Sequence, residues 1–354
     1  MSGHGPPAAG GVARPPHRDA VRRRRPAGGE VVEVAVETSR DTLISRIRRL
    51  RLRYDDAVAG GPSHVFWKSQ RDGTDPKWHE FDHKEVAFYR QVAVDTPAGP
   101  LPRCYEASVE TTGAWYLVLE DLTASHEALG EWPLPPSIEP YRAVVEAHAR
   151  FHAAWWDHER LGISVGAFAD EAGVFDRYLA AMPAELATFA DRLGERLSPE
   201  RRRLYERMVE AAPRLLDRYR THRDLTIVHG DAHVWNAMLP RQAGGGVRLI
   251  DWDAWRVDVA SDDLAYMLAV HCFPDWRARY ERDSVRGYHD ALGAHGVRGY
   301  AFEALWQDYR RSVLWQLGTP MWQANHNLPP WIWWNHLERV MRAIDDLDCL
   351  DLLD

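Results

Sequence analysis

The 354 residues exceed what one ordinary hydrophobic core holds, so we expect two lobes. Hydrophobic residues make up 45% and charged residues 27% of the chain, and no apolar run approaches the roughly 20 residues of a membrane span. The net charge of −8 disfavours nonspecific nucleic-acid binding, and three scattered cysteines argue against a disulfide framework and a structural zinc site. The composition therefore predicts a cytoplasmic protein without a nucleic-acid or membrane partner, and it leaves the oligomeric state open.

The first part of the chain predicts a tail followed by a small β-rich lobe. Residues 1–29 combine Gly, Pro, Ala and Arg without an apolar period, which indicates disorder. From Val31 the segments "VVEVAVE", "SRIRRLRLRYD" and "SHVFWKS" alternate as strands do. A helix, "WHEFDHKEVAFYRQVA", and a hairpin that turns near Gly113 follow. We expect the first lobe to cover residues 30–122.

Beyond this point the pattern becomes mostly helical. Three long segments, 138–160, 174–196 and 198–222, carry apolar residues with a 3.6-residue period, and the third begins with a Ser-Pro-Glu start signal. Later the segment "VRLIDWDAW" predicts a short strand that enters a loop, and the remaining chain predicts amphipathic helices rich in tryptophan. The sequence therefore predicts an α+β fold whose large helical lobe covers residues 123–354.

The stretch "TIVHGDAHVWNAMLP" contains, within a short apolar run, four side chains that could bind a metal or take part in catalysis: His229, Asp231, His233 and Asn236. His229, Asp231 and His233 alternate, so a strand could present them together to zinc or iron. Alternatively, one or both histidines fill the core and are satisfied by internal hydrogen bonds. A third interpretation is phosphoryl transfer, because Asp231 and Asn236 reproduce the Asp-x-x-x-x-Asn spacing of a kinase catalytic loop.

The third interpretation accounts for further residues elsewhere in the chain. Phosphoryl transfer needs a carboxylate beside the acceptor hydroxyl, oxygen ligands for magnesium and a lysine on the nucleotide phosphates. Asp251 follows a short strand, where a second magnesium ligand belongs. Lys68, one of only three lysines, ends the third strand, and Glu85 lies on the following helix. Each spacing is weak evidence by itself, but the combination of these residues, in this order along the chain, is a specific indication of phosphoryl transfer.

With these motifs in place, the sequence resembles the aminoglycoside phosphotransferase and choline kinase-like superfamily of small-molecule kinases. The signature "HGDxHxxN" stands unaltered at His229 to Asn236, and "IDWD" and "SDDLAYML" are similar to the metal-binding segment and the following helix of that family. The segments "EVAFYR" and "LVLEDL" resemble its first-lobe helix and its hinge, and "LEDL" favours the choline or ecdysteroid kinase-like branch. The resemblance runs from about Val31 to the C-terminus and implies a bilobal, protein-kinase-like fold.

The resemblance also implies roles for single residues. Asp231 would be the catalytic base, and Asn236 and Asp251 would hold Mg²⁺. Lys68 with Glu85 would position the phosphates of the donor, which is ATP or GTP.

Further positions would support this chemistry. Backbone groups near Glu120 and Leu122 would contact the adenine. His229 would tie the catalytic loop to Asp263, and His233 would support the same loop. Asp253 would either help to bind the second metal ion or be a surface carboxylate, and the sequence favours neither.

One departure from kinases lies in the loop between the first two strands. Residues 37–46, "ETSRDTLISR", contain no glycine, although glycine normally permits close backbone approach to phosphate. Either Ser39, Thr42 and Ser45 supply the phosphate contacts in another geometry, or nucleotide binding is altered.

The resemblance predicts an ATP-dependent O-phosphotransferase that acts on a hydroxyl of an antibiotic, amino alcohol, nucleoside or sugar-like metabolite, with a slight preference for resistance or biosynthetic chemistry. Two alternatives stay open: a nucleotide-binding pseudokinase, and a metallohydrolase that uses His229, Asp231 and His233. The acceptor pocket is expected between helices of the second lobe. Aromatic faces suitable for such a pocket occur at five positions, most of which we expect to be core residues: Trp315, Trp322, Trp331, Trp333 and Trp334.

Overall fold

The computed structural model describes residues 30–42, 44–55, 61–75, 78, 81, 83–97, 99–130 and 137–354. The tail predicted at residues 1–29 lies outside this part of the chain. The chain forms two compact units. The first comprises the described residues of Met1–Glu80 together with Arg103–Asp121, and the second comprises Phe81–Pro102 together with Leu122–Asp354. The expected boundary after residue 122 therefore does not account for Phe81–Pro102, which groups with the helical unit.

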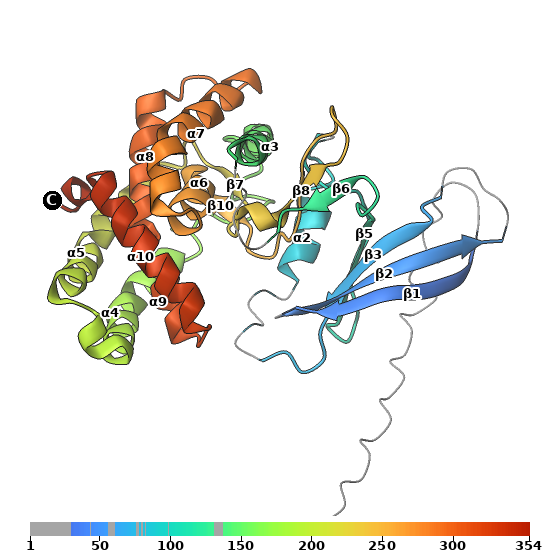
Figure 1. The fold of residues 1–354 in the computed structure, drawn as a ribbon, viewed down its shortest axis with the longest axis horizontal. Coiled ribbons are helices and arrows are strands. Elements are labelled where there is room, and N and C mark those ends of the chain that lie inside the picture. The colour runs from blue at the N-terminus through green and yellow to red at the C-terminus, as the bar shows by residue number, and fades with distance from the viewer. Residues whose placement is uncertain are drawn as a thin grey trace, which may run out of the picture. The chain divides into compact units, whose positions relative to one another are not determined.

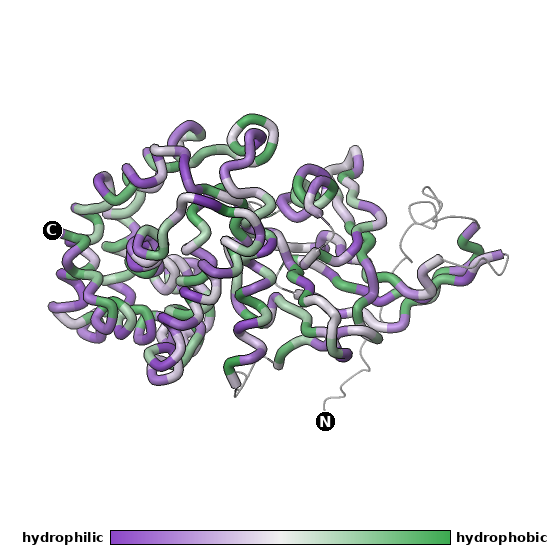
Figure 2. Tube along the Cα trace, turned by 90° about the horizontal axis from the view of Figure 1, so that it is seen from above, coloured by the Kyte–Doolittle hydropathy of each residue, from purple (hydrophilic) through white to green (hydrophobic). Residues whose placement is uncertain are grey.

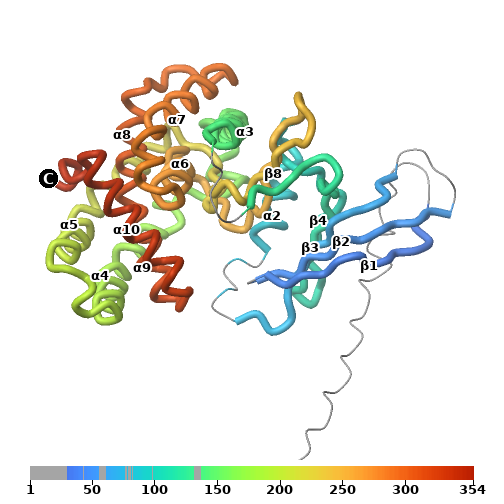
Figure 3. Tube along the Cα trace, viewed as in Figure 1, coloured from blue at the N-terminus to red at the C-terminus, as the bar shows by residue number. Residues whose placement is uncertain are grey.

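The first unit contains a five-stranded antiparallel sheet with the strand order β1-β2-β3-β5-β4. Strands β1, β2 and β3 lie side by side in chain order (Figure 3). The five strands predicted from alternation are all present. Their bounds are β1 (Val31–Asp41), β2 (Ser45–Tyr54), β3 (His64–Gln70), β4 (Cys104–Val109) and β5 (Trp115–Glu120).

One face of this sheet carries the hydrophobic core of the first unit. Trp67 of β3 and Tyr116 of β5 stack there, with ring centroids 4.5 Å apart and ring planes 10° from parallel. Consecutive side chains of a strand point to opposite faces, so Lys68 lies on the other face. Its register partners on the neighbouring strands are Ile47 and Leu117. Although Lys68 stands outside the apolar core, only 6% of it is exposed.

The second unit is mostly helical (Figure 1). The helices carry hydrophobic and hydrophilic residues in short alternating stretches, as amphipathic packing requires (Figure 2). A Ser-Pro-Glu sequence starts α5 as expected, because the Ser198 side chain accepts a hydrogen bond from the Arg201 amide at 3.4 Å. The helices are α2 (Lys84–Gln91), α3 (Glu139–Trp155), α4 (Val174–Leu193), α5 (Pro199–Leu215), α6 (Ser261–Ala265), α7 (Pro274–Ala294), α8 (Phe302–Trp315), α9 (Gly318–Asn325) and α10 (Pro330–Asp346).

Two helices differ from their expected form. The first, α2, is shorter than the expected span of residues 78–93, because His83 takes a left-handed conformation with φ 67° directly before the helix begins. The second, α6, continues as a π-helical turn at Tyr266–Val270. Such turns are rare and occur frequently at functional sites. No helix in the described ranges is long and apolar enough to cross a membrane.

Two small sheets in the second unit hold the segment that contains the "HGDAHVWN" motif. The strand before the motif, β7 (Thr226–Val228), pairs with β10 (Arg256–Asp258). The strand after it, β8 (Ala237–Pro240), lies between β6 (His126–Ala128) and β9 (Arg248–Leu249). These strands have two to four residues each, too few for an alternation pattern, and only β9 was expected from the sequence. Both ends of the motif are thus fixed by backbone pairing.

Candidate active site

The motif forms a tight loop that only glycine can make. Gly230 has φ 79°, and a Cβ atom at this position would lie 2.3 Å from the backbone oxygen of Ala254. The left-handed conformation and the absence of space together require glycine here. A single 3-10 turn, Val234–Asn236, follows and leads into β8. The loop therefore places Asp231 and Asn236 side by side.

Asp231 and Asn236 are directly hydrogen-bonded. The Asn236 Nδ2 atom donates to the backbone oxygen of Asp231 at 2.9 Å and to its carboxylate Oδ2 at 3.0 Å. The His233 Nε2 atom lies 3.4 Å from the same carboxylate oxygen. Burial favours the neutral form of Asp231, but the adjacent His233 outweighs it and holds the pKa of Asp231 well below its ordinary value. Asp231 is therefore an ionised carboxylate with about a third of its side chain exposed.

The residues expected to hold magnesium are brought together by one backbone contact. The amide of Ile250 donates to the backbone oxygen of Asn236 at 2.9 Å, which places the start of the "IDWD" segment beside the motif. Asp251 has φ 70°, a left-handed backbone conformation that aspartate adopts more readily than most residues. Both hydrogens of the Asn236 amide are used within the loop, so its oxygen is the group left for a cation. An amide oxygen with a carboxylate is the hard donor set that Mg²⁺ prefers.

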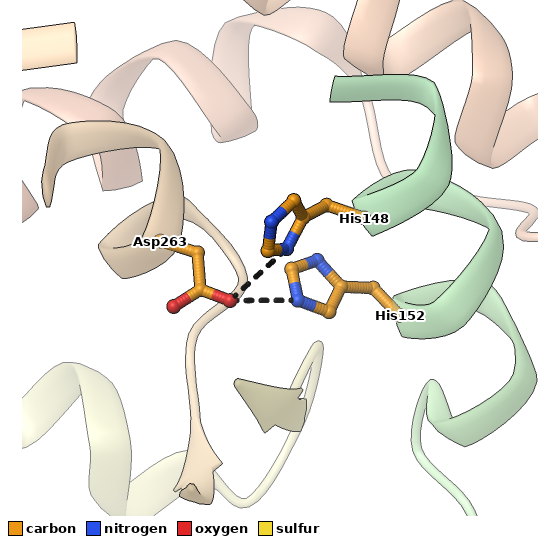
Figure 4. A group of neighbouring side chains, drawn as sticks. All are labelled: His148, His152 and Asp263. Carbon is orange, nitrogen blue, oxygen red and sulfur yellow. Dashed lines mark hydrogen bonds and ion pairs between the residues drawn. The ribbon is translucent and has the colours of Figure 1, made fainter. Parts of the chain in front are cut away.

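Asp263 anchors the loop from α6. Its Oδ1 accepts a hydrogen bond from the Gly230 amide at 2.9 Å, and its Oδ2 accepts one from the His229 amide at 2.7 Å. Figure 4 shows two histidines of α3 that point at the same carboxylate: His152 Nε2 lies 3.1 Å and His148 Nδ1 lies 3.5 Å from Oδ2. These three residues could in principle group around a metal ion. The carboxylate oxygens are already occupied by backbone amides, so we interpret the group as a hydrogen-bonded support of the loop.

The sequence did not single out His148 and His152. A usable signal existed, because their i, i+4 spacing in "HARFH" places both side chains on one face of a helix. What the spacing could not show is the partner, since Asp263 follows His152 by 111 residues. His152 is also held from its other side, where Nδ1 lies 2.6 Å from the Tyr288 hydroxyl.

His229 lies in the core with both ring nitrogens engaged. Its Nε2 donates to the backbone oxygen of Ile250 at 2.9 Å, and its Nδ1 accepts from the Asp231 amide at 3.3 Å. Trp252 packs on the ring, with centroids 4.5 Å apart. A histidine bonded in this way has no lone pair for a metal, so the geometry weighs against a metal set of His229, Asp231 and His233.

Glu85 connects α2 to the "IDWD" segment within the second unit. Its Oε1 accepts a hydrogen bond from the Trp252 amide at 3.3 Å, and only 3% of the residue is exposed. Phe88 of the same helix stacks on Trp252, with centroids 4.1 Å apart and planes 8° from parallel. Glu85 and the "IDWD" segment are thus neighbours, although 167 residues separate Glu85 from Trp252. Lys68 belongs to the first unit, so its relation to Glu85 stays a prediction.

The other residues predicted to bind the nucleotide lie at or near the ends of strands. Ser45 is buried at the start of β2, and its hydroxyl lies 2.9 Å from that of Thr42, so it stabilises the turn between β1 and β2. Glu120 ends β5, where its carboxylate accepts a hydrogen bond from the Arg103 amide at 3.0 Å. Leu122 is buried and opens the second segment of the second unit. Their roles as nucleotide ligands stay predictions.

The five tryptophans divide into core and surface. Trp333 is buried and packs edge to face against Phe189. Trp331 is 63% exposed. Trp322 stacks on His326, with ring centroids 4.4 Å apart. Neither of these two ring contacts involves the motif, where a different tryptophan, Trp235, lies beside His233, at 5.1 Å between centroids.

Four buried histidines and the half-buried His233 make the stability of the protein depend on pH. Burial lowers the pKa of His148, His229 and His271, and it lowers that of His336 to about 3. These four bind protons in the unfolded chain at higher pH than in the folded one, so their contribution is lost as pH falls below about 6.5. His233 acts in the opposite direction, because Asp231 outweighs its burial and raises its pKa.

The four histidines with a lowered pKa outnumber the one with a raised pKa. We therefore expect the urea concentration at the midpoint of unfolding to decrease as the pH is lowered from 7.5 to 5. The variant His336→Asn should show a flatter dependence, because it lacks one of the groups that must stay neutral. A midpoint that is constant or rises towards pH 5 would contradict this account.

Comparison with known proteins agrees with this geometry. The model of the phosphotransferase enzyme family matches residues 23–306. Among solved structures, an ethanolamine kinase from Plasmodium vivax superposes with a TM-score of 0.55 at 11% identity, covering 88% of this chain and 82% of that one. The GDP complex of a mutant aminoglycoside 2′-phosphotransferase-IIIa superposes with a TM-score of 0.50 at 9% identity, covering 91% and 93%. No curated protein matches the sequence.

The matched residues include all of the motif, its anchor Asp263 and the "IDWD" segment. The β-sheet of the first unit and the helices of the second correspond to the α+β architecture predicted from the sequence. The solved structures have 11% and 9% sequence identity to this chain, and at this level the similarity indicates the fold alone. The chain therefore belongs to the phosphotransferase enzyme family and has an α+β, protein-kinase-like fold.

Proposed function

We propose that this enzyme transfers the γ-phosphoryl group of ATP to a hydroxyl of a small molecule. The observation that carries the proposal is the pairing of the ionised Asp231 with Asn236 in a loop whose backbone is fixed by the buried Asp263. A preorganised carboxylate beside an amide oxygen ligand is what phosphoryl transfer requires, since catalysis there depends on positioning and charge stabilisation.

The reaction assigns a separate task to each group. The acceptor hydroxyl donates a hydrogen bond to Asp231, its oxygen attacks the γ-phosphorus, and the bond to the β,γ-bridging oxygen breaks as Asp231 takes the proton. Asn236 and Asp251 would hold Mg²⁺, which neutralises charge on the phosphate oxygens when it is bound. Lys68 would contact the nucleotide phosphates, and Glu85 would keep α2 beside the metal-binding segment.

The identities of the phosphate donor and of the acceptor are inferred from the chemistry of the site and from similarity to solved structures. GDP is bound to the aminoglycoside phosphotransferase that this chain resembles in fold, so GTP is the alternative donor. The acceptors named for the similar structures are an amino alcohol and aminoglycosides, which share a free hydroxyl. A pseudokinase would also bind nucleotide, but it has no need for an ionised carboxylate at Asp231.

The test measures binding and turnover separately. Isothermal titration with ATP and with GTP, in Mg²⁺ and in EDTA, gives the affinity for the donor. ADP formation is then followed with choline, ethanolamine, kanamycin, sugars and nucleosides as acceptors. We expect acceptor-dependent ADP formation that falls at least about 100-fold when EDTA removes the metal. Nucleotide binding without transfer to any acceptor would favour the pseudokinase, and tightly held zinc would favour the hydrolase.

A further inference from the structure

Two histidines that no motif contains lie beside the catalytic loop. His271 follows the π-helical turn Tyr266–Val270, and His336 lies in α10. Their ring centroids are 4.7 Å apart, and the ring of His271 is 5.3 Å from that of His233. His233 in turn contacts Asp231. The histidine pair therefore lies one side chain away from the proposed catalytic base.

The hydrogen bonds of the pair determine which nitrogen carries the proton. His271 Nδ1 lies 2.9 Å from the backbone oxygen of Tyr266, and His336 Nδ1 lies 2.8 Å from the amide Oε1 of Gln323. Both oxygens can only accept, so each Nδ1 donates. Burial lowers the pKa of both rings, which keeps them neutral and leaves each Nε2 as an acceptor.

These two Nε2 atoms have no hydrogen-bond partner among the residues that the structure describes. His271 and His336 are only 3% and 7% exposed. The Nε2 atom of Gln323, a donor, is in the same situation. Buried polar groups normally find partners, so two acceptors and one donor without one, on residues less than a tenth exposed, indicate a place for a polar ligand.

The charged groups near His271 and His336 influence which ligand charge is favoured there. Arg339 donates to the backbone oxygen of His271 at 3.0 Å, and its positive charge contributes to the lowered pKa of His336. No carboxylate forms an ion pair with either ring within the described ranges. The charge of Arg339 disfavours a cationic amine at His336, although the carboxylate of Asp231 acts on both rings in the opposite sense. The rings of Tyr266 and Trp235, 4.6 Å and 5.5 Å from His271, instead offer flat apolar faces.

We propose that His271 and His336 form the acceptor subsite, where their Nε2 atoms accept hydrogen bonds from adjacent hydroxyls of a neutral sugar ring. The aromatic faces of Tyr266 and Trp235 contact the ring, and another of its hydroxyls reaches Asp231. This inference rests on the proposed phosphotransferase function and narrows the acceptor to neutral sugars or nucleosides, in place of polycationic aminoglycosides.

The test uses substitutions that remove one nitrogen at a time. In His271→Asn and His336→Asn the amide nitrogen can still donate as Nδ1 does, but nothing replaces Nε2. In His336→Gln the amide oxygen reaches the Nε2 position and can accept. The matched control is His289→Asn, since His289 also bonds a backbone carbonyl, that of Tyr300 at 2.8 Å, but belongs to α7 and not to the pair.

The acceptors are glucose, ribose and adenosine, with glucosamine and kanamycin as cationic comparisons. We expect the wild-type enzyme to prefer a neutral acceptor, each Asn variant to raise its KM about tenfold while ATP affinity stays within twofold, and His336→Gln to recover most of the loss. Unchanged KM in both Asn variants, or preference for kanamycin or glucosamine, would overturn the subsite.

Direct binding separates failure of the subsite from failure of the proposed function. The imidazole ¹⁵N signals of His271 and His336 should shift when the preferred neutral sugar is added to the enzyme with a bound ATP analogue. If ATP binds and kanamycin or glucosamine is phosphorylated, but none of the neutral acceptors shifts these signals, the subsite is wrong and the kinase assignment stands. If ATP with Mg²⁺ does not bind and no acceptor yields ADP, the proposed function itself fails.

Discussion

Asp231→Asn is expected to lower kcat about 10³-fold while the affinity for ATP stays within twofold. The amide keeps the shape of the carboxylate and can retain the hydrogen bond from Asn236, but it cannot accept the proton of the acceptor hydroxyl. Loss of a general base usually costs 10²- to 10⁴-fold in rate. Steady-state ADP formation with the preferred acceptor measures kcat, and isothermal titration measures ATP affinity.

The matched control for this prediction is Glu127→Gln, which also neutralises a carboxylate. Glu127 is exposed and pairs with Arg241 at 3.0 Å on the surface of the small β6-β8-β9 sheet. Its substitution should leave kcat within twofold. An Asp231→Asn enzyme that retains more than about a tenth of the wild-type kcat would exclude Asp231 as the base. Loss of ATP binding in this variant would indicate a structural role instead.

Asp263→Asn is expected to lower the free energy of unfolding by about 3 kcal/mol. Burial favours the neutral acid, but the neighbouring rings of His148 and His152 hold the pKa of Asp263 well below its ordinary value. The ionised group accepts N–H donors at both oxygens, including the amides of His229 and Gly230. The substitution turns one oxygen into an amide nitrogen that faces a donor. Urea unfolding at pH 7.5 measures the change.

Glu338→Gln serves as the control for stability. Glu338 pairs with Arg201 at 2.6 Å, but 44% of its side chain is exposed, so its loss should cost less than about 1 kcal/mol. Asp263→Asn should also lower kcat, because the loop that carries Asp231 loses its anchor. Equal destabilisation by the two variants would contradict the buried anchor, and full activity in Asp263→Asn would show that Asp231 is positioned without it.

The sequence alone determined those features whose signal is local. Alternation in segments such as "VVEVAVE" predicted three strands of the first unit, because a half-buried strand repeats every second residue, and the hairpin near Gly113 predicted the other two. The eight-residue motif from His229 to Asn236 placed Asp231 and Asn236 in one loop, since partners five residues apart meet through local backbone geometry. Gly230 belongs to the same signal, because a tight left-handed turn requires glycine.

Only the tertiary structure decided which distant residues support that loop. The Trp252 amide reaches Glu85 across 167 residues, and His152 reaches Asp263 across 111. His271 and His336 meet because the π-helical turn and α10 pack together, and no periodicity along the chain encodes that encounter. Such contacts depend on how whole helices pack, which residue spacing does not specify. The loop that carries Asp231 and Asn236 could therefore be predicted from the sequence, whereas its anchor and the proposed acceptor subsite required the fold.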